Sequence, residues 1–135
     1  MRPFLILMGV VVAFGMAACG SGIQPLGPTP ADQGIVIYMH ADFVGPAQAL
    51  NVDVPDLGNV EGSCSSGAEG EVPSWSDCIS SVKVLPGWTA TLYRDPKFKG
   101  ASVTVTSDTP NLRQLSGPCD HTFNDCVSSI KVARQ

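Results

Sequence analysis

Residues 76–84 read SDCISSVKV and residues 124–132 read NDCVSSIKV, so the chain contains one nine-residue phrase twice. Each copy joins an aspartate, a cysteine and two serines to a short apolar alternation, which is typical of a half-buried strand. A second pattern precedes each copy, YMHADFVG at 38–45 and YRDPKFKG at 93–100. Because a short repeat cannot bury its own apolar face, we expect two similar halves that stack on each other.

Short runs rich in β-branched and aromatic residues predict an all-β sandwich or barrel. Turn residues separate these runs, which are 35–38, 79–85, 89–93, 101–106 and 127–132. The two tyrosines that open the second pattern lie 55 positions apart, but the aspartates of the phrase lie only 48 apart. The first half is therefore longer by 7 residues. We assign the excess to an extended loop at 59–73.

The first 18 residues are typical of an export signal. A basic Arg2 precedes an apolar run that is shorter than the roughly 20 residues of a membrane-spanning helix. The end of this run, Met16-Ala17-Ala18-Cys19, resembles the lipobox of bacterial lipoproteins. The resemblance implies cleavage before Cys19, acylation of its sulfur and anchoring in a lipid bilayer. The alternatives are an uncleaved anchor helix and an ordinary signal peptide.

The expected organisation is a signal peptide at 1–18, a lipidated Cys19 with a flexible Gly- and Pro-rich tether at 19–33, and one domain at 34–135. The mature chain would sit at a bacterial outer membrane or cell surface. It would carry seven basic and twelve acidic residues, a formal charge of −5. No basic stripe is present, which argues against nucleic acid as a partner.

The order Tyr-x4-Phe-x-Gly, then [N/D]-[N/D]-x-x-[S/T]-S, resembles the βγ-crystallin Greek-key motif over residues 35–132. The resemblance implies two four-stranded Greek keys packed as a sandwich, with motif 1 at about 35–85 and motif 2 at about 89–132. The glycines Gly45 and Gly100 would allow a positive φ where the first hairpin of each motif folds over. The last serines of the phrases, Ser81 and Ser129, would hydrogen-bond across that hairpin.

Microbial members of the family often bind calcium, and the resemblance implies two sites for this ion. Calcium takes six to eight oxygen ligands. Each phrase would supply a carboxylate, the backbone carbonyl of the next residue and a hydroxyl three positions after the aspartate. A backbone carbonyl from the hairpin of the other half would complete each site. The first site would comprise Ser76, Asp77, Cys78 (backbone), Ser80 and Arg94 (backbone), and the second Asn124, Asp125, Cys126 (backbone), Ser128 and Met39 (backbone).

The two calcium sites are not expected to be equal. The second phrase fits the family pattern fully, whereas Ser76 stands where Asn or Asp is usual. We therefore predict that the first site is weaker. The alternative is that both phrases are structural turns without metal.

Four cysteines remain once Cys19 is acylated, and four allow three pairings. An exported location permits disulfides. Equivalent positions in the two halves favour Cys64–Cys78 and Cys119–Cys126.

No sequence motif of catalysis is found, so an enzyme is not expected. The predicted function is a membrane-anchored, calcium-binding, non-enzymatic protein of the bacterial envelope. The alternatives are a protease inhibitor, with the loop at 59–73 as its reactive segment, and an adhesive or carbohydrate-binding surface protein. The sequence predicts no specific protein or glycan partner.

Overall fold

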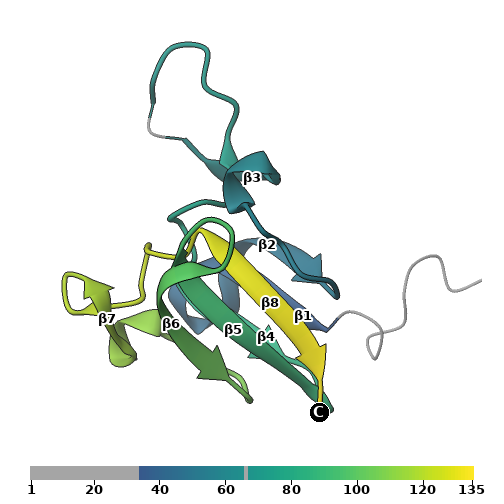
Figure 1. The fold of residues 1–135 in the computed structure, drawn as a ribbon. Helices are drawn as coiled ribbons and strands as arrows, with labels where there is room; N and C mark the ends of the chain where they lie inside the picture. Colours follow the sequence, from purple (N-terminus) through teal and green to yellow (C-terminus); the bar gives the residue numbers. More distant parts are fainter. Residues whose placement is uncertain (1–33, 66) are drawn as a thin grey trace, which may run out of the picture.

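A computed structural model describes residues 34–65 and 67–135 as two three-stranded antiparallel sheets (Figure 1). One sheet has the order β2-β1-β4 and the other β6-β5-β8. The strands of the first are β1 (Ile35–His40), β2 (Val44–Leu50) and β4 (Ser81–Val84), and those of the second β5 (Trp88–Asp95), β6 (Lys99–Val105) and β8 (Ser129–Arg134). The short strands β3 (Glu61–Cys64) and β7 (Ser116–Cys119) and the 3-10 turns η2 (Ala41–Phe43), η3 (Leu57–Asn59) and η4 (Leu112–Gln114) complete the described part.

The predicted all-β class and the two-fold repetition are confirmed. The predicted signal peptide, Cys19 and the tether lie outside the described residues. Within the described ranges, no helix has the length and apolar character needed to cross a membrane.

The core lies between the two sheets. The central strands β1 and β5 bury alternate residues, which is why their sequences alternate in character. Trp75 and Phe123 precede the two phrases at equivalent positions, and each is only 2% exposed. Other large side chains that are fully buried are Ile35, Ile37, Leu57, Ile79, Leu92, Leu112 and Ile130.

Each half contributes a third segment, residues 51–56 in the first half and 106–110 in the second, to the sheet of the other half. Val54 exchanges two backbone hydrogen bonds with Ile130 of β8, at 2.8 and 2.9 Å. The equivalent pair, Thr109 and Val82 of β4, exchanges bonds of 2.8 and 3.0 Å. This exchange makes the two halves one domain and brings the two repeated phrases side by side.

The first hairpin of each half folds over at a left-handed bend. Phe43 has φ 60° and Phe98 φ 59°, and each ring packs edge-on against the tyrosine of its own pattern with centroids 5.7 Å apart. The following glycines, Gly45 and Gly100, have φ 85° and 77°. A Cβ at Gly45 would also collide with the imidazole of His40, so glycine is required there on two grounds.

Strand β2 was not predicted, although β6, its equivalent in the second half, was. The sequence of β2 is VGPAQAL, and Gly and Pro weaken the strand signal. The sheet order explains why the strand forms nevertheless. It lies at the edge, where a proline N–H is not needed for pairing on the outer side.

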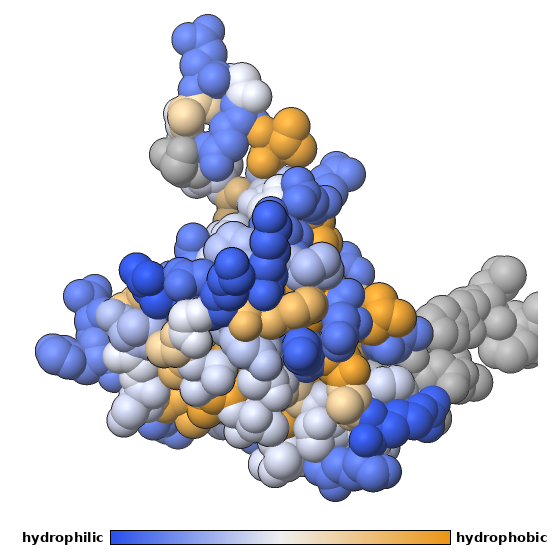
Figure 2. All heavy atoms as spheres, viewed as in Figure 1, coloured by the Kyte–Doolittle hydropathy of each residue, from blue (hydrophilic) through white to orange (hydrophobic). Residues whose placement is uncertain are grey.

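The extra residues of the first half form a loop that projects beyond β3 (Figure 1). The cysteines that flank this loop are 14 positions apart, against 7 for the equivalent pair in the second half. The predicted excess of seven residues therefore lies in this loop. Figure 2 shows the loop standing clear of the rest of the molecule and carrying mostly hydrophilic residues.

Candidate functional site

The two repeated phrases pack against each other through their backbones. The N–H of Asp125 donates to the carbonyl of Ile79 at 3.1 Å, and the N–H of Asp77 donates to the carbonyl of Val127 at 3.0 Å. Both aspartates have left-handed backbones, with φ 51° and 55°. Aspartate tolerates this conformation better than most residues. The turn therefore places each carboxylate at the surface while the flanking residues enter the core.

The structure corrects the predicted division of ligands between the two sites. The hydroxyl of Ser80 donates to the Asp125 carboxylate at 3.3 Å, and the hydroxyl of Ser128 donates to the Asp77 carboxylate at 3.1 Å. Each serine thus meets the aspartate of the other phrase, not that of its own. The cause is the exchange of third segments, which sets the two phrases antiparallel across the interface between the halves.

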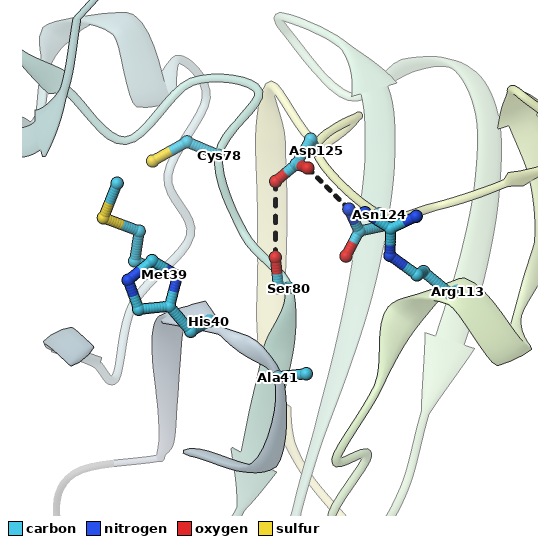
Figure 3. Close-up of a pocket in the computed structure, with 8 residues that line it drawn as sticks. All are labelled: Met39, His40, Ala41, Cys78, Ser80, Arg113, Asn124 and Asp125. Atoms are coloured by element: carbon cyan, nitrogen blue, oxygen red, sulfur yellow. Dashed lines mark hydrogen bonds between the residues drawn. The ribbon is translucent and has the colours of Figure 1, made fainter. Parts of the chain in front are cut away.

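The Asp125 site is a cavity of about 370 Å³ between the first hairpin and the second phrase (Figure 3). The N–H of Ser80 donates to the carbonyl of Tyr38 at 3.0 Å, which fixes the hairpin beside the serine. Met39 therefore lies with Asp125, as the resemblance implied. The lining residues are Met39, His40, Ala41, Cys78, Ser80, Arg113, Asn124 and Asp125.

The Asp77 site adjoins a second cavity, of about 320 Å³, at the base of the projecting loop. Its walls are Cys64, Ser65, Glu71, Ser74, Ser76 and Asp77. The N–H of Ser128 donates to the carbonyl of Tyr93 at 2.9 Å, so the second hairpin also passes beside this site. Arg94 follows that tyrosine but does not line the cavity, and its side chain is ion-paired with Asp95 at 3.1 Å.

The residues before the two aspartates hold the carboxylates differently. The amide of Asn124 donates to an Asp125 carboxylate oxygen at 2.5 Å. The hydroxyl of Ser76 is farther from the Asp77 carboxylate, at 3.4 Å, and lies equally far from the Ser128 hydroxyl. The substitution noted in the sequence therefore replaces one short hydrogen bond by two long ones.

One polar atom in the Asp125 site lacks a partner. Asn124 is 9% exposed, and its Oδ1 is the buried side-chain atom of the described residues for which no hydrogen bond is found. An unsatisfied buried oxygen is costly, so an acceptor aimed at a cavity calls for a donor or a cation. This oxygen fits a ligand that prefers oxygen donors.

The donor set favours a hard cation over a transition metal. Across residues 34–65 and 67–135, no group of three or more His, Cys, Asp or Glu side chains is placed to hold a metal ion. The Asp125 site instead offers a carboxylate, the Ser80 hydroxyl and the Asn124 side chain, and the Asp77 site offers the carboxylates of Asp77 and Glu71 with serine hydroxyls. Such oxygens suit calcium, whereas zinc and copper prefer imidazole and thiolate.

Both predicted cysteine pairs are present, Cys64–Cys78 and Cys119–Cys126, with Cα–Cα distances of 6.1 and 5.8 Å. Cys78 and Cys126 each follow the aspartate of a phrase, so each bridge braces the turn that presents a carboxylate. Cys78 lines the Asp125 cavity while Cys64 lines the Asp77 cavity. The first bridge therefore connects the walls of the two sites.

Two charged residues of these cavities, Arg113 and Glu71, were not predicted from the sequence. Neither belongs to a repeated pattern. Arg113 comes from η4, and Glu71 comes from the projecting loop. Comparing the two halves position by position would have found both, because the first lies opposite a glycine and the second lies in the excess segment.

No family model matches the chain. Spherulin-3A of Physarum polycephalum is 28% identical over 104 residues, which cover 77% of this chain and 85% of that protein. The chain is also similar to a βγ-crystallin domain from Flavobacterium johnsoniae, at 28% identity and a TM-score of 0.56, covering 75% of this chain and 94% of that one. A double mutant of clostrillin in complex with nickel is 26% identical with a TM-score of 0.53, and covers 73% of this chain and 95% of its own.

The folded hairpins, the exchanged third segments and these similarities agree with one another. The chain therefore has the βγ-crystallin fold, and its sequence resembles that family.

Proposed function

We propose that this protein is a non-enzymatic calcium-binding module with one calcium site at each repeated phrase. The observation that carries the proposal is the reciprocal pairing of Ser80 with Asp125 and of Ser128 with Asp77. It gathers carboxylate and hydroxyl oxygens from different phrases at two equivalent places. The unpartnered Asn124 Oδ1 supports the same reading at the second place.

The residues that would hold calcium follow from this pairing. Asp125, Asn124 and Ser80 would serve one ion, and the backbone carbonyls of Met39 and Cys78, two residues that line the same cavity, would add ligands. Asp77, Ser76 and Ser128 would serve the other, with the backbone carbonyls of Arg94 and Cys126 as the equivalent groups. The nickel complex of the clostrillin mutant supports the idea that a domain of this fold can accommodate a divalent ion.

The proposal also places the domain outside the cytoplasm, anchored to a bacterial membrane through an acylated Cys19. The support is the lipobox-like Met16-Ala17-Ala18-Cys19 in the sequence and the two disulfides, which persist in oxidising compartments. A tethered domain at the envelope would meet extracellular calcium, for which dissociation constants between about 10⁻⁴ and 10⁻³ M are usual.

Calorimetric titration of the purified domain with calcium chloride tests the proposal. The wild type should bind up to two ions, Asp77→Asn and Asp125→Asn should each lose one, and the double variant should bind none. Glu61→Gln is the matched control, because Glu61 is an exposed carboxylate that lines neither cavity. A wild type that gives neither heat nor a melting shift with calcium would leave both phrases as structural turns.

A second candidate function is inhibition of a protease. The observation that favours it is the projecting loop (Figure 2), which is closed at its base by the Cys64–Cys78 bridge. Val72, in this loop, is 73% exposed. A disulfide at the base of a loop lowers the entropy that the loop loses when it binds.

A further inference from the structure

The two candidate calcium sites differ in charge, although the phrases that build them are alike. Arg113 lines the Asp125 cavity, and its equivalent in the first half is Gly58. The equivalence is structural as well as sequential. The backbone N–H of Arg113 donates to Asn111 Oδ1 at 3.0 Å, and the backbone N–H of Gly58 donates to Asp56 Oδ1 at 2.8 Å.

The Asp125 site therefore contains a built-in positive charge. The Arg113 side chain reaches from η4 toward Asn124 and Asp125 (Figure 3). It also lines a neighbouring cavity of about 230 Å³, together with Asp120 and the same two residues. In the described part of the chain, Arg113 forms no ion pair with either carboxylate. The guanidinium, which stays charged at all physiological pH values, is thus available to act on the site.

The charged residues around the Asp77 site are acidic, not basic. Its cavity contains a second carboxylate, Glu71, which the Ser65 hydroxyl contacts at 3.2 Å. Arg94, on the hairpin beside this site, is ion-paired with Asp95. The Asp125 cavity has no such second acid and instead contains His40 and Arg113.

We propose that Arg113 is a tethered competitor for the cation at Asp125, and that Asp77, helped by Glu71, forms the tighter calcium site. The inference rests on the proposed function. It reverses the order that the Ser76 substitution alone predicts. The reason is that a charge near a divalent ion acts through space on both of its positive charges, whereas the serine changes only one hydrogen bond.

The solvent exposure of the charged groups limits how strongly Arg113 changes the calcium affinity of the Asp125 site. Exposed charge pairs contribute modestly and are screened by salt. With a divalent ion as one partner, we expect removal of the guanidinium charge to tighten binding on the order of threefold to tenfold at low ionic strength. The difference should shrink at about 0.5 M salt, where the screening length falls below 5 Å.

Calcium chloride titration of single-site variants tests this. Asp77→Asn isolates the Asp125 site, and Asp125→Asn isolates the Asp77 site. We expect the Asp125→Asn protein to bind calcium more tightly than the Asp77→Asn protein. Adding Arg113→Gln to Asp77→Asn should tighten binding threefold to tenfold, and adding Arg113→Lys, which keeps the charge, should not. Adding Glu71→Gln to Asp125→Asn should weaken binding.

The outcomes separate the two proposals. Two results would overturn the inference and leave the proposed function standing. One is tighter calcium binding at the Asp125 site than at the Asp77 site, and the other is an equal change in affinity with Arg113→Gln and with Arg113→Lys. Absence of binding in the wild type and in every variant would overturn both. Melting curves without calcium check that each variant is folded, since Arg113 is exposed and its replacement should not change the melting temperature.

Discussion

At the scale of the residue, one serine in each half ties the bent hairpin to the sheet. Ser81 is fully buried, and its hydroxyl accepts from the N–H of Phe43 at 3.1 Å and donates to the carbonyl of His40 at 2.6 Å. Ser129 does the same for the second hairpin, with Phe98 at 3.0 Å and Asp95 at 2.6 Å. Each hydroxyl thus satisfies one donor and one acceptor of a left-handed bend.

We predict that Ser81→Ala lowers the free energy of unfolding by about 1–3 kcal/mol, because it leaves a part-buried N–H and carbonyl without partners. Urea denaturation followed by fluorescence measures the change, and Ser129→Ala should give a similar value. Ser102→Ala is the control, since Ser102 lies exposed on β6. A loss no larger than that of the control would show that water replaces the hydroxyl at the bend.

At the scale of the element, the sequence predicts the strands better than it predicts their partners. The alternation after each phrase located β4 and β8, and the repeats located the bends. The third segments carry no strand signal, because they read NVDVPD at 51–56 and TSDTP at 106–110. Asp53 and Asp108 instead accept from the backbone N–H groups of Val132 and Val84, at 2.8 and 2.9 Å. A repeat shows which residues are equivalent, but it does not show whether a partner lies in the same half or in the other.

Whether a partner lies in the same half or in the other half determines which residues come together in each candidate site. The residue types of both sites could be predicted from the phrases. Their grouping could not, because Ser80 and Ser128 meet the aspartates across the interface that the third segments create. Arg113 and Glu71 lay outside the motif altogether, and only the folded chain brings them to the carboxylates.

The projecting loop provides a prediction about an element. Residues 65–73 should be replaceable by Asp-His, the pair found at 120–121 in the second half, without loss of the fold. Loop length changes closure entropy only slowly, and the graft reproduces the spacing of the Cys119–Cys126 bridge. A proline could not take this place, since Asp120 and His121 have φ 47° and 67°.

Thermal melting and mass-spectrometric mapping of the bridges measure the result of the graft. We expect a melting temperature within a few degrees of the wild type and an intact Cys64–Cys78 bridge. The same variant decides the second candidate function. If the wild type inhibits a panel of serine and metalloproteases, the graft should not, and inhibition retained by the graft would exclude the loop as the reactive segment.

At the scale of the whole molecule, each candidate site is built from both halves. Asp125 belongs to the second half and Ser80 to the first, and the other site has the reverse arrangement. The third segments bind the two sheets in the same reciprocal way. A ligand at either site would therefore hold both halves together, and neither half could unfold while the ion stayed bound.

We predict that calcium shifts the unfolding of the entire domain as a single transition. Binding to the native state alone adds about 4 kcal/mol at a calcium concentration of a thousand times Kd. Differential scanning calorimetry with and without calcium measures this, and Asp77→Asn and Asp125→Asn should each give one transition with a smaller shift. Two separate transitions in either variant, with calcium moving only the half that keeps its aspartate, would mean that each half holds its ion alone. An ion shared by both halves cannot stabilise one of them without the other. That result would therefore mean that the reciprocal contacts between the phrases play no part in calcium binding.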